Sequence, residues 1–313
     1  MIDIIIPAYN AHETIKKTLL SIMMQVNINE IKVYIIDDFS DCGYEEEYNI
    51  FKDKMNIELY RLEKNMGPGY ARQIGIEKSN SEYLLFIDSD DYIHNIFSIK
   101  NLYEKALETQ CDIVIGDLEE INGDEIYTYT VGFDILHSKL YSRQFILNNN
   151  ISFPYMYNSE DLSFNNLAIM CNPHIEYVDD IIYVYKRREN SLTMDDSYYK
   201  NRHIKYYSKN LIWTIEKAEK NNYDSYEIAK IIISSFAYLY YYFYNNFEAK
   251  DMKYVYKLVP FYQRYEKYID EESKLELVGF WIERFEQIPL EISFEDFVSM
   301  CINKYKSTHV KDL

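Results

Sequence analysis

Hydrophobic positions come in short continuous runs along the first hundred residues, and amphipathic stretches separate these runs. Runs of this length, without regular alternation, are typical of strands that are buried on both faces of a sheet. The stretches between them carry apolar residues at helical spacing. The predicted strands are residues 2–7, 31–36, 57–62 and 83–87, and the predicted helices are residues 13–25, 44–54 and 70–79.

This alternation predicts an α/β fold with a mostly parallel sheet, because parallel strands need a crossover helix between them. In such sheets ligands gather outside the carboxyl ends of the strands. Polar or turn-forming residues follow each predicted strand: Pro7, Asp37 and Asp38, the segment 65–69, and Asp88. The sequence therefore predicts a binding site at this edge of the sheet.

The pattern changes after a helix predicted at residues 96–109. Next we expect two strands with an acidic turn between them, a short helix, an irregular stretch and another helix, at residues 113–115, 126–131, 142–148, 153–159 and from Ser159 onward. From about residue 201 the spacing is helical throughout. We therefore predict one catalytic body in two halves, residues 1–105 and 106–200, and a helical extension, residues 201–313.

Charge and cysteine content narrow the class of protein. The 313 residues include 51 acidic and 33 basic side chains, a formal net charge of −18. Binding to a nucleic-acid backbone needs a positive surface, so we do not expect nucleic acid as a partner. The four cysteines form no CxxC pair, which indicates reduced thiols. The chain starts without a basic leader segment, and we expect a cytoplasmic protein.

Two segments of the C-terminal part allow a membrane or partner role. Residues 228–247 are apolar but interrupted by polar residues, so we expect a buried helix rather than a membrane span. That helix would pack on the catalytic body or in a homodimer. Residues 253–265 mix basic and aromatic side chains, which suits either the inner face of an anionic membrane or core packing with lysine ends in water. We favour core packing.

The most informative short segment is Asp88-Ser89-Asp90-Asp91, which directly follows a predicted strand. In an extended chain residues i and i+2 face the same side, so we expect Asp88 and Asp90 on one face. Carboxylates this close repel one another unless a cation lies among them. Hard oxygen ligands suit Mg²⁺ or Mn²⁺. The alternative is a solvated acidic turn.

Four segments at successive strand ends carry a family resemblance. They are residues 4–10 (IIIPAYN), 35–40 (IIDDFS), 65–72 (NMGPGYAR) and 86–91 (FIDSDD). Together they resemble the inverting family 2 glycosyltransferases of the GT-A fold, strongly over residues 1–100, fairly to residue 195, and not beyond. The resemblance implies a metal-dependent transfer of one sugar from a UDP-sugar to a hydroxyl of a glycan, a lipid-linked glycan or a protein. Residues 1–105 would bind the nucleotide sugar, and residues 106–200 the acceptor.

The resemblance also implies roles for individual residues. Asp38 would accept the imide N–H of uracil, with a helix cap as the alternative, and Asp37 would only order the loop. Arg72 would bind a phosphate or a uracil oxygen, or else form a surface salt bridge. Asp90 with Asp91 would hold Mn²⁺ or Mg²⁺, while Asp88 reaches the ribose or a water on the metal. Further donor contacts would come from Pro7, Ala8, Tyr9, Asn65, Gly67 and Ser89.

Residues 158–164 (NSEDLSF) resemble the acidic motif of the same family. Asp161 would be the base that takes the proton of the acceptor hydroxyl, and Glu160 its neighbour or an acceptor ligand. Paired carboxylates raise one another's pKa, which suits a general base. The alternative is an acidic pair at the positive end of a helix.

Residues 185–193 resemble the segment of this family that closes over the donor, with Arg187 and Arg188 near the pyrophosphate. The basic residues from Lys200 onward fit a solvated helix face equally well. No QxxRW segment is present, which disfavours processive polymer synthesis.

Two other classes of protein bind sugar nucleotides on a related α/β sheet or without catalysis. A nucleotidyltransferase that makes sugar nucleotides would carry a glycine-rich basic loop after the first strand, and residues 8–14 have neither feature. A noncatalytic sugar-nucleotide-binding scaffold would not need Asp88, Asp90 and Asp161 together. The metal-dependent transferase is therefore the favoured hypothesis.

Overall fold

The computed structural model describes residues 1–155, 159–187, 203–246, 252–284 and 292–309. The chain divides into two compact units, Met1–Met194 and Asp195–Leu313. The predicted halves 1–105 and 106–200 lie in the first unit except for residues 195–200, and the predicted extension 201–313 lies in the second.

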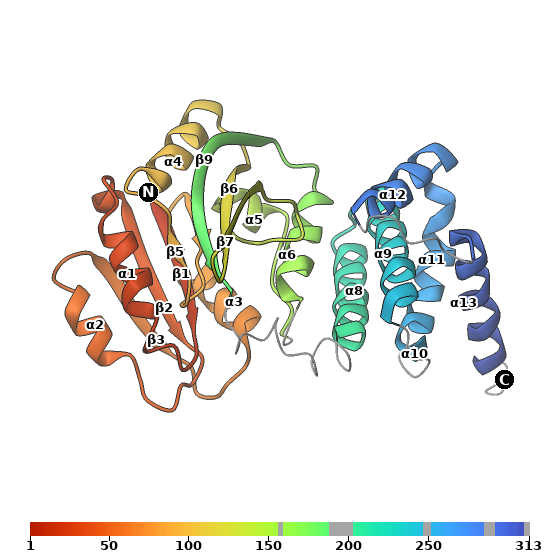
Figure 1. The fold of residues 1–313 in the computed structure, drawn as a ribbon, viewed down its shortest axis with the longest axis horizontal. Coiled ribbons are helices and arrows are strands. Elements are labelled where there is room, and N and C mark those ends of the chain that lie inside the picture. Colours follow the sequence, from red (N-terminus) through yellow and green to blue (C-terminus); the bar gives the residue numbers. More distant parts are fainter. Residues whose placement is uncertain (156–158, 188–202, 247–251, 285–291, 310–313) are drawn as a thin grey trace. The chain divides into compact units, whose positions relative to one another are not determined.

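The four predicted N-terminal strands are present and pair in parallel (Figure 1). They are β1 (Ile2–Ala8), β2 (Ile31–Asp37), β3 (Asn56–Arg61) and β4 (Tyr83–Phe86), in the spatial order β3-β2-β1-β4. The three crossover helices are α1 (Ile15–Met23), α2 (Glu45–Phe51) and α3 (Pro68–Lys78). Every residue of β1 is buried, as the continuous apolar run predicts. The N-terminal half therefore forms the predicted parallel sheet.

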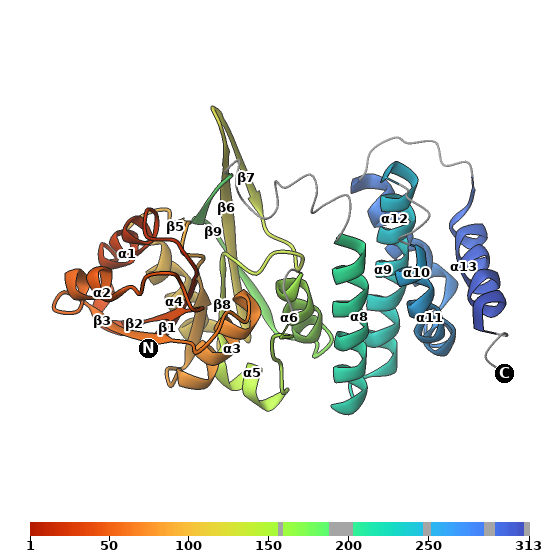
Figure 2. The same cartoon turned by 90° about the horizontal axis from the view of Figure 1, so that it is seen from below.

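The sheet continues past β4 with strands of mixed direction. Strand β8 (Lys139–Ser142) pairs antiparallel with β4, and β6 (Ile113–Asn122) pairs antiparallel with β8. Strand β9 (Ile175–Lys186) runs parallel to β6, and β5 (Tyr92–Ile93) closes the order. The predicted strand at 113–115 reaches Asn122 and forms a hairpin with β7 (Glu125–Thr130) that projects from the sheet (Figure 2). Gly123 has a φ of 63° in its turn, a conformation that suits glycine.

Strands β5, β8 and β9 were not expected from the sequence. Two of them are very short, and β9 carries acidic residues that hide its apolar positions. The helices of this half are α4 (Ser98–Thr109), α5 (Arg143–Asn148) and α6 (Glu160–Ile169), close to the predicted ranges.

Strand register gathers the loops of the site at one edge. Ala8 is paired with Asp37, and Asp37 with Arg61, so three parallel strands end side by side. Gly67, with a φ of 87°, precedes α3 in a conformation that favours glycine. A Cβ on Gly69 would lie 2.8 Å from the carbonyl oxygen of Pro154 and 2.9 Å from Cγ of Glu160. This glycine therefore allows α3 to approach the start of α6.

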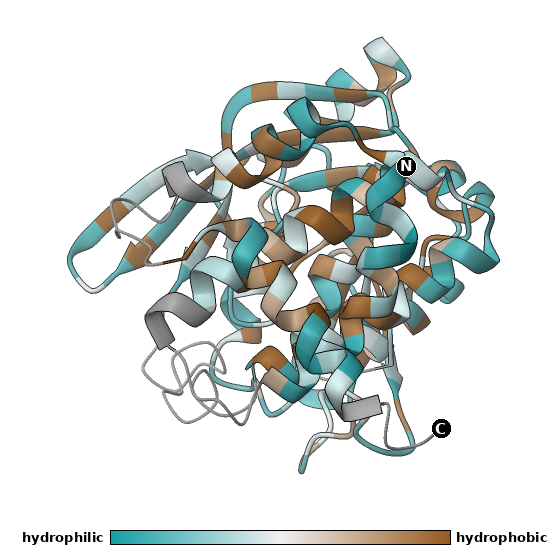
Figure 3. Ribbon diagram, turned by 90° about the vertical axis from the view of Figure 1, so that its right-hand side faces the viewer, coloured by the Kyte–Doolittle hydropathy of each residue, from teal (hydrophilic) through white to brown (hydrophobic). Residues whose placement is uncertain are grey.

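The described residues of the second unit form helices joined by short connections. Its α-helices are α8 (His203–Lys220), α9 (Ser225–Asn246), α10 (Met252–Val255), α11 (Val259–Tyr265), α12 (Glu271–Arg284) and α13 (Phe294–His309). Two short 3₁₀ turns, η2 (Tyr256–Leu258) and η3 (Glu266–Tyr268), flank α11. Apolar and polar residues alternate along these helices (Figure 3). The helices α8 to α13 confirm the predicted helical C-terminal region.

The two C-terminal segments of interest pack into this unit. Ile228, Ile232 and Phe236 of α9 are buried, as predicted for a buried helix. Within the ranges given above, no helix has both the length and the apolar character needed to cross a bilayer. Val255 and Tyr262 are also buried, which supports core packing for residues 253–265. Homodimer formation through these helices stays a prediction.

Candidate functional site

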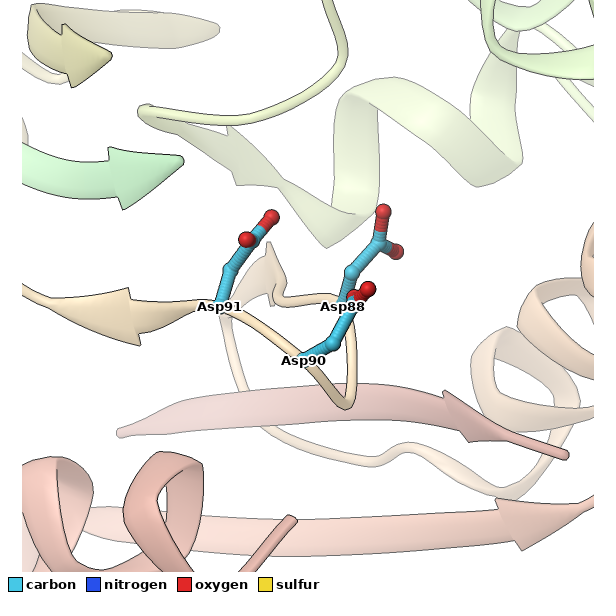
Figure 4. Close-up of side chains that lie close together, drawn as sticks. All are labelled: Asp88, Asp90 and Asp91. Carbon is cyan, nitrogen blue, oxygen red and sulfur yellow. The ribbon is translucent and has the colours of Figure 1, made fainter. Parts of the chain in front are cut away.

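Three aspartates gather where the chain leaves β4. The strand ends at Phe86, and the backbone N–H of Asp91 donates to the carbonyl of Asp88 across a turn (3.2 Å). The expectation of an extended segment is therefore wrong here, because the chain turns at Ser89 and Asp90. The turn itself brings together one carboxylate oxygen each from Asp88, Asp90 and Asp91, within 4.8 Å of one another. Their side chains point to the same side of the turn (Figure 4).

Asp91 is the most buried member of this acid cluster, with 2% of its surface exposed. Its carboxylate accepts from the hydroxyl of Tyr183 (2.8 Å) and the backbone N–H of Lys186 (3.3 Å). Burial and the charges of Asp88 and Asp90 raise the pKa of Asp91 to about 7. A buried acid with two acidic neighbours is stabilised by a divalent cation, and its hard oxygens suit Mg²⁺ or Mn²⁺. The cluster therefore fits the predicted metal.

Asp88 contacts two cationic side chains. One carboxylate oxygen accepts from Nη2 of Arg72 at 2.7 Å, and the other lies 3.2 Å from Nε2 of His137. Burial pushes the pKa of Asp88 upward, but His137 and Arg72 hold it well below its usual range. Burial lowers the pKa of His137, yet Asp88 beside it produces a net rise. Asp88 is therefore ionised and charge-paired.

Arg72 connects the acid cluster to the second acidic motif. Its Nη1 donates to Oε1 of Glu160 at 2.6 Å, while Nη2 binds Asp88. The arginine is only 4% exposed, so the alternative of a surface salt bridge is wrong. Two segments far apart in sequence thus meet at one guanidinium. Donor binding by Arg72 stays a prediction.

Asp161 and Glu160 occupy the first turn of α6. The backbone N–H of Leu162 donates to Oδ1 of Asp161 at 2.8 Å. Burial raises the pKa of both carboxyls above the ordinary values, although Arg72 acts in the opposite direction. The pair does stand at a helix N-terminus, and Arg72 also places it beside the acid cluster. The helix-terminus interpretation is therefore correct, and the role of Asp161 as a base stays a prediction.

Asp38 lies at the carboxyl end of β2 and organises the glycine loop. Its two carboxylate oxygens accept from the backbone N–H groups of Met66 and Gly67, each at 2.7 Å. Burial raises its pKa, and these two hydrogen bonds oppose the rise. Asn65 donates from Nδ2 to the Asp38 carbonyl at 3.1 Å. Asp38 does not cap the following helix α2, which begins after Tyr44, and its contact with uracil stays a prediction.

Asp37 orders its loop, as expected. It accepts from the backbone N–H of Ser40 and from Nη1 of Arg61, both at 2.9 Å. Phe39, which the sequence interpretation overlooked, is 47% exposed with a φ of 65°, and the Arg61 guanidinium lies 5.4 Å from its ring centre. A large aromatic residue within the polar segment that follows β2 is the sequence signal that could have identified it. Such backbone strain in a bulky residue persists only when its surroundings hold it.

The remaining predicted donor residues occupy different environments. Tyr9 is 52% exposed, whereas Pro7 and Ala8 are buried in β1. Ser89 is nearly buried, and its carbonyl accepts from Thr14 Oγ1 at 2.9 Å. Tyr9 is therefore the exposed aromatic group at the end of β1.

Arg187 and Arg188 were predicted near the donor pyrophosphate. The Arg187 side chain is engaged by Glu120 of β6, and its backbone N–H donates to Ile121 at 2.9 Å. The structure thus places this guanidinium on β6 rather than on the acid cluster. Arg188 and the rest of the closing segment, residues 188–193, lie outside the described residues.

Two residues of the site lie outside every recognised motif. His137 comes from the loop between β7 and β8, and its ring stacks on that of Tyr183 at 4.6 Å with 24° between the planes. The hydroxyl of Tyr183 accepts from the backbone N–H of Asp88 at 3.1 Å. Nothing local in the sequence indicates either residue, because strand pairing brings both to the site.

Comparison with known proteins agrees with the family resemblance of the sequence motifs. Residues 3–161 match the family model described as glycosyl transferase family 2. The glycosyltransferase GlyA of Streptococcus pneumoniae is 26% identical over 220 residues, covering 61% of this chain and 31% of GlyA. The poly(ribitol-phosphate) beta-N-acetylglucosaminyltransferase TarS of Staphylococcus aureus is 26% identical over 213 residues, 63% of this chain and 37% of TarS. A poly(ribitol-phosphate) beta-glucosyltransferase of Bacillus spizizenii is 28% identical over 215 residues, 63% of this chain and 34% of that protein. The chain spans about a third of the length of these relatives.

Solved structures show the fold. Residues 1–349 of S. aureus TarS superpose with a TM-score of 0.69 at 19% identity, covering 93% of each chain. The same fragment in complex with UDP-GlcNAc gives 0.68 at 20% identity and covers 91% of each chain. The predicted GT-A architecture with a helical C-terminal part is confirmed, with a sheet that is parallel in its first half and mixed in its second.

Proposed function

The chain belongs to glycosyl transferase family 2, and from this premise we propose that it is a metal-dependent, inverting glycosyltransferase. It would move a single sugar from a UDP-sugar to a hydroxyl group of an acceptor. One observation carries the proposal: Arg72 binds Asp88 of the acid cluster and Glu160 of the acidic pair through the same guanidinium.

Through this bridge, the groups that we propose for the two chemical tasks of the reaction lie close together. The departing nucleoside diphosphate needs positive charge, and the attacking hydroxyl needs a base on the opposite face of the sugar. Asp161, next to Glu160 on α6, is the candidate base that takes the hydroxyl proton. Its raised pKa brings it closer to the operating pH, where a general base is most effective.

The acid cluster would hold Mn²⁺ or Mg²⁺ through Asp90 and Asp91, with Asp88 beside them. A bound divalent ion supplies the positive charge that the leaving diphosphate requires. At the neighbouring strand ends, exposed Tyr9 would support the base, and buried Asp38 would hold the loop that precedes α3.

The choice of donor and acceptor is supported by the named relatives. TarS has been solved with UDP-GlcNAc, which supports a UDP-sugar donor for this chain. Two relatives are named for transfer to poly(ribitol-phosphate), which makes a hydroxyl of an anionic polyol-phosphate polymer the first acceptor to test. Synthesis of a cell-surface glycopolymer or glycoconjugate is the corresponding process.

The test is a screen for UDP and GDP release from several UDP- and GDP-sugars, with Mn²⁺, Mg²⁺ or EDTA, and with or without poly(ribitol phosphate). We expect UDP release from a UDP-sugar that the acceptor accelerates and EDTA abolishes. Unchanged turnover in EDTA would remove the metal from the proposal. Preference for GDP-sugars would remove the assigned donor class.

The same assay separates the two rival classes. A nucleotidyltransferase would form pyrophosphate from UTP and a sugar phosphate, and a scaffold would bind the UDP-sugar without releasing UDP. The Arg72 bridge to an acidic pair favours the transferase, because neither rival needs a base beside the metal-binding acids.

A further inference from the structure

His137 makes a contact with the acid cluster that no recognised motif accounts for. Its side chain is 14% exposed, and Nε2 lies 3.2 Å from Oδ2 of Asp88. The other oxygen of this carboxylate is bound by Arg72, so a guanidinium and an imidazole face Asp88 from two directions.

We propose that His137 is a positioning residue that fixes the carboxylate of Asp88 in the acid cluster. The loop that carries it, residues 131–138, would form a second connection between this cluster and helix α6. The contact between His137 and Asp88 does not depend on the proposed function. Only the expected effect of His137 on metal binding rests on that function.

The His137 ring is itself held in place. It stacks on Tyr183, whose hydroxyl accepts from the backbone N–H of Asp88 and donates to the carboxylate of Asp91. The stack therefore fixes the imidazole relative to two members of the cluster at once. A residue that contacts a metal ligand without binding the metal itself orients that ligand, and His137 would do this for the acidic side chains of the cluster.

The loop is anchored at its other end by two buried side chains. Nζ of Lys139 donates to the carbonyl oxygens of Gly132, at 2.8 Å, and Ile135. Nδ2 of Asn165 donates to the same Ile135 carbonyl at 3.0 Å, and Asn165 belongs to α6. The path from Asp88 through His137 and the loop thus reaches the helix that begins with Glu160.

Asp88 and α6 are consequently connected twice, once through Arg72 and once through this loop. With Arg72 alone the carboxylate could turn about one contact, whereas the His137 imidazole places Nε2 3.2 Å from the second oxygen, at ion-pair distance and without a hydrogen bond. Loss of His137 should therefore weaken metal binding while leaving contacts with the nucleotide base intact.

The first test is a double-mutant cycle on thermal stability with His137→Phe, Asp88→Asn and the double variant. Phenylalanine keeps a ring to stack on Tyr183 and removes the nitrogen that faces Asp88. We expect the two single effects to be non-additive, as for residues in direct contact. Additive effects would overturn the proposal. The His137→Ala variant, which also removes the nitrogen that faces Asp88, serves if the phenylalanine variant does not fold.

The second test measures Mn²⁺ affinity by electron paramagnetic resonance of the free ion, with UDP present, and UDP affinity in EDTA by calorimetry. His137→Phe should weaken Mn²⁺ binding about tenfold, the size found for outer-shell partners, with UDP affinity in EDTA unchanged. His137→Gln should recover part of the loss. His174→Phe is the matched control, because His174 lies at an exposed site just before β9, with Nε2 3.3 Å from a carboxylate oxygen of Glu176.

Parent-like Mn²⁺ affinity in His137→Phe would overturn the positioning role. A parent protein that binds no Mn²⁺ would overturn the metal in the proposed function. The stability cycle would still decide whether His137 holds Asp88, so the two failures are distinguishable.

Discussion

At the residue scale, the site contains several carboxylates, and their surroundings shift their pKa values in different directions. Asp88 has its pKa lowered by His137 and Arg72 against the effect of burial, whereas burial and two acidic neighbours raise that of Asp91 to about 7. Burial also raises the pKa of Asp161, and the charge of Arg72 opposes that rise. Surroundings that give neighbouring acids different pKa values are typical of sites where proton and charge transfer occur.

Replacing Asp161 by Asn should remove the base and leave the donor site intact. We expect sugar transfer to fall by about 10²- to 10⁴-fold, the usual contribution of a general base. UDP affinity with Mn²⁺ should stay at the parent value, measured by calorimetry. Near-normal transfer in a variant that still binds UDP would show that another group takes the proton.

The pH dependence of transfer should report the same carboxylate. A base acts only when ionised, so kcat should fall as the pH drops through the pKa of Asp161, which lies above the 3.8 of an ordinary aspartate. Arg72→Gln removes a charge that lowers this pKa, and the acid limb should therefore move to higher pH. An acid limb that stays at the same pH in Arg72→Gln would contradict the assignment.

At the scale of elements, the close approach of α3 to the start of α6 determines how the two acidic motifs meet. Gly69 allows the approach, because a Cβ there would lie 2.8 Å from the Pro154 carbonyl oxygen. That contact involves backbone, which cannot move aside as a flexible side chain can. The distance between the candidate base and the acid cluster thus depends on one missing methyl group.

Gly69→Ala should therefore destabilise the protein by about 1–3 kcal/mol, the usual cost of overpacking, and reduce transfer. Gly279→Ala is the control, because Gly279 lies in α12 with no neighbouring atom within 4 Å of a new Cβ. That change should raise stability by up to about 1 kcal/mol, since alanine is the better helix former. Thermal or urea unfolding measures both, and equal effects of the two changes would contradict the packing argument.

Prediction from the sequence succeeded where the signal is local. The strands β1 to β4 and the acidic motifs at their ends are short, contiguous patterns, so Asp38, Arg72 and Asp88 could be recognised individually. Their connections could not be predicted, because the bridge to Glu160 depends on long-range packing. His137 and Tyr183 were missed because they come from a loop and from β9, whose positions depend on pairing with distant strands.

At the scale of the whole molecule, the response of stability to acid and the net charge have different origins: the first includes a single buried histidine, and the second comes from the whole chain. His203 of the second unit lies against aromatic rings, with Nε2 2.7 Å from the hydroxyl of Tyr238. Burial lowers its pKa to about 4. The negative charge of −18, by contrast, is a property of the entire chain.

Stability of the second unit should rise with pH between about 4 and 6.5. In this window the unfolded chain binds a proton on His203 that the folded unit does not, so unfolding is favoured as the pH falls toward 4. His203→Gln should flatten this dependence in thermal melts of the full chain. The exposed His174, changed in the same way, is the control. An unchanged slope in His203→Gln would show that other groups cause the acid sensitivity.

Salt should stabilise the whole molecule. Repulsion among the excess acidic groups opposes the compact state and is screened over about 10 Å at 0.1 M ionic strength. Raising NaCl from low to moderate concentration at neutral pH should therefore raise Tm by about 2–4 °C, the shift that 1 kcal/mol gives a chain of this size. Sucrose at matched osmolarity separates charge screening from general exclusion effects. A fall in Tm with NaCl would mean that attractive ion pairs outweigh the repulsion.

The Arg72 bridge also has a consequence for recombination between relatives. Its two acidic partners are Asp88 and Glu160, so the sequence from residue 72 to residue 160 has to work as one inherited block. A chimera with its junction inside this block would combine an arginine from one parent with an acid from another, and the geometry of α3 and α6 would not be matched. Junctions placed after α6 keep the block whole. Exchange of the region beyond it is thus the recombination that leaves the Arg72 bridge intact.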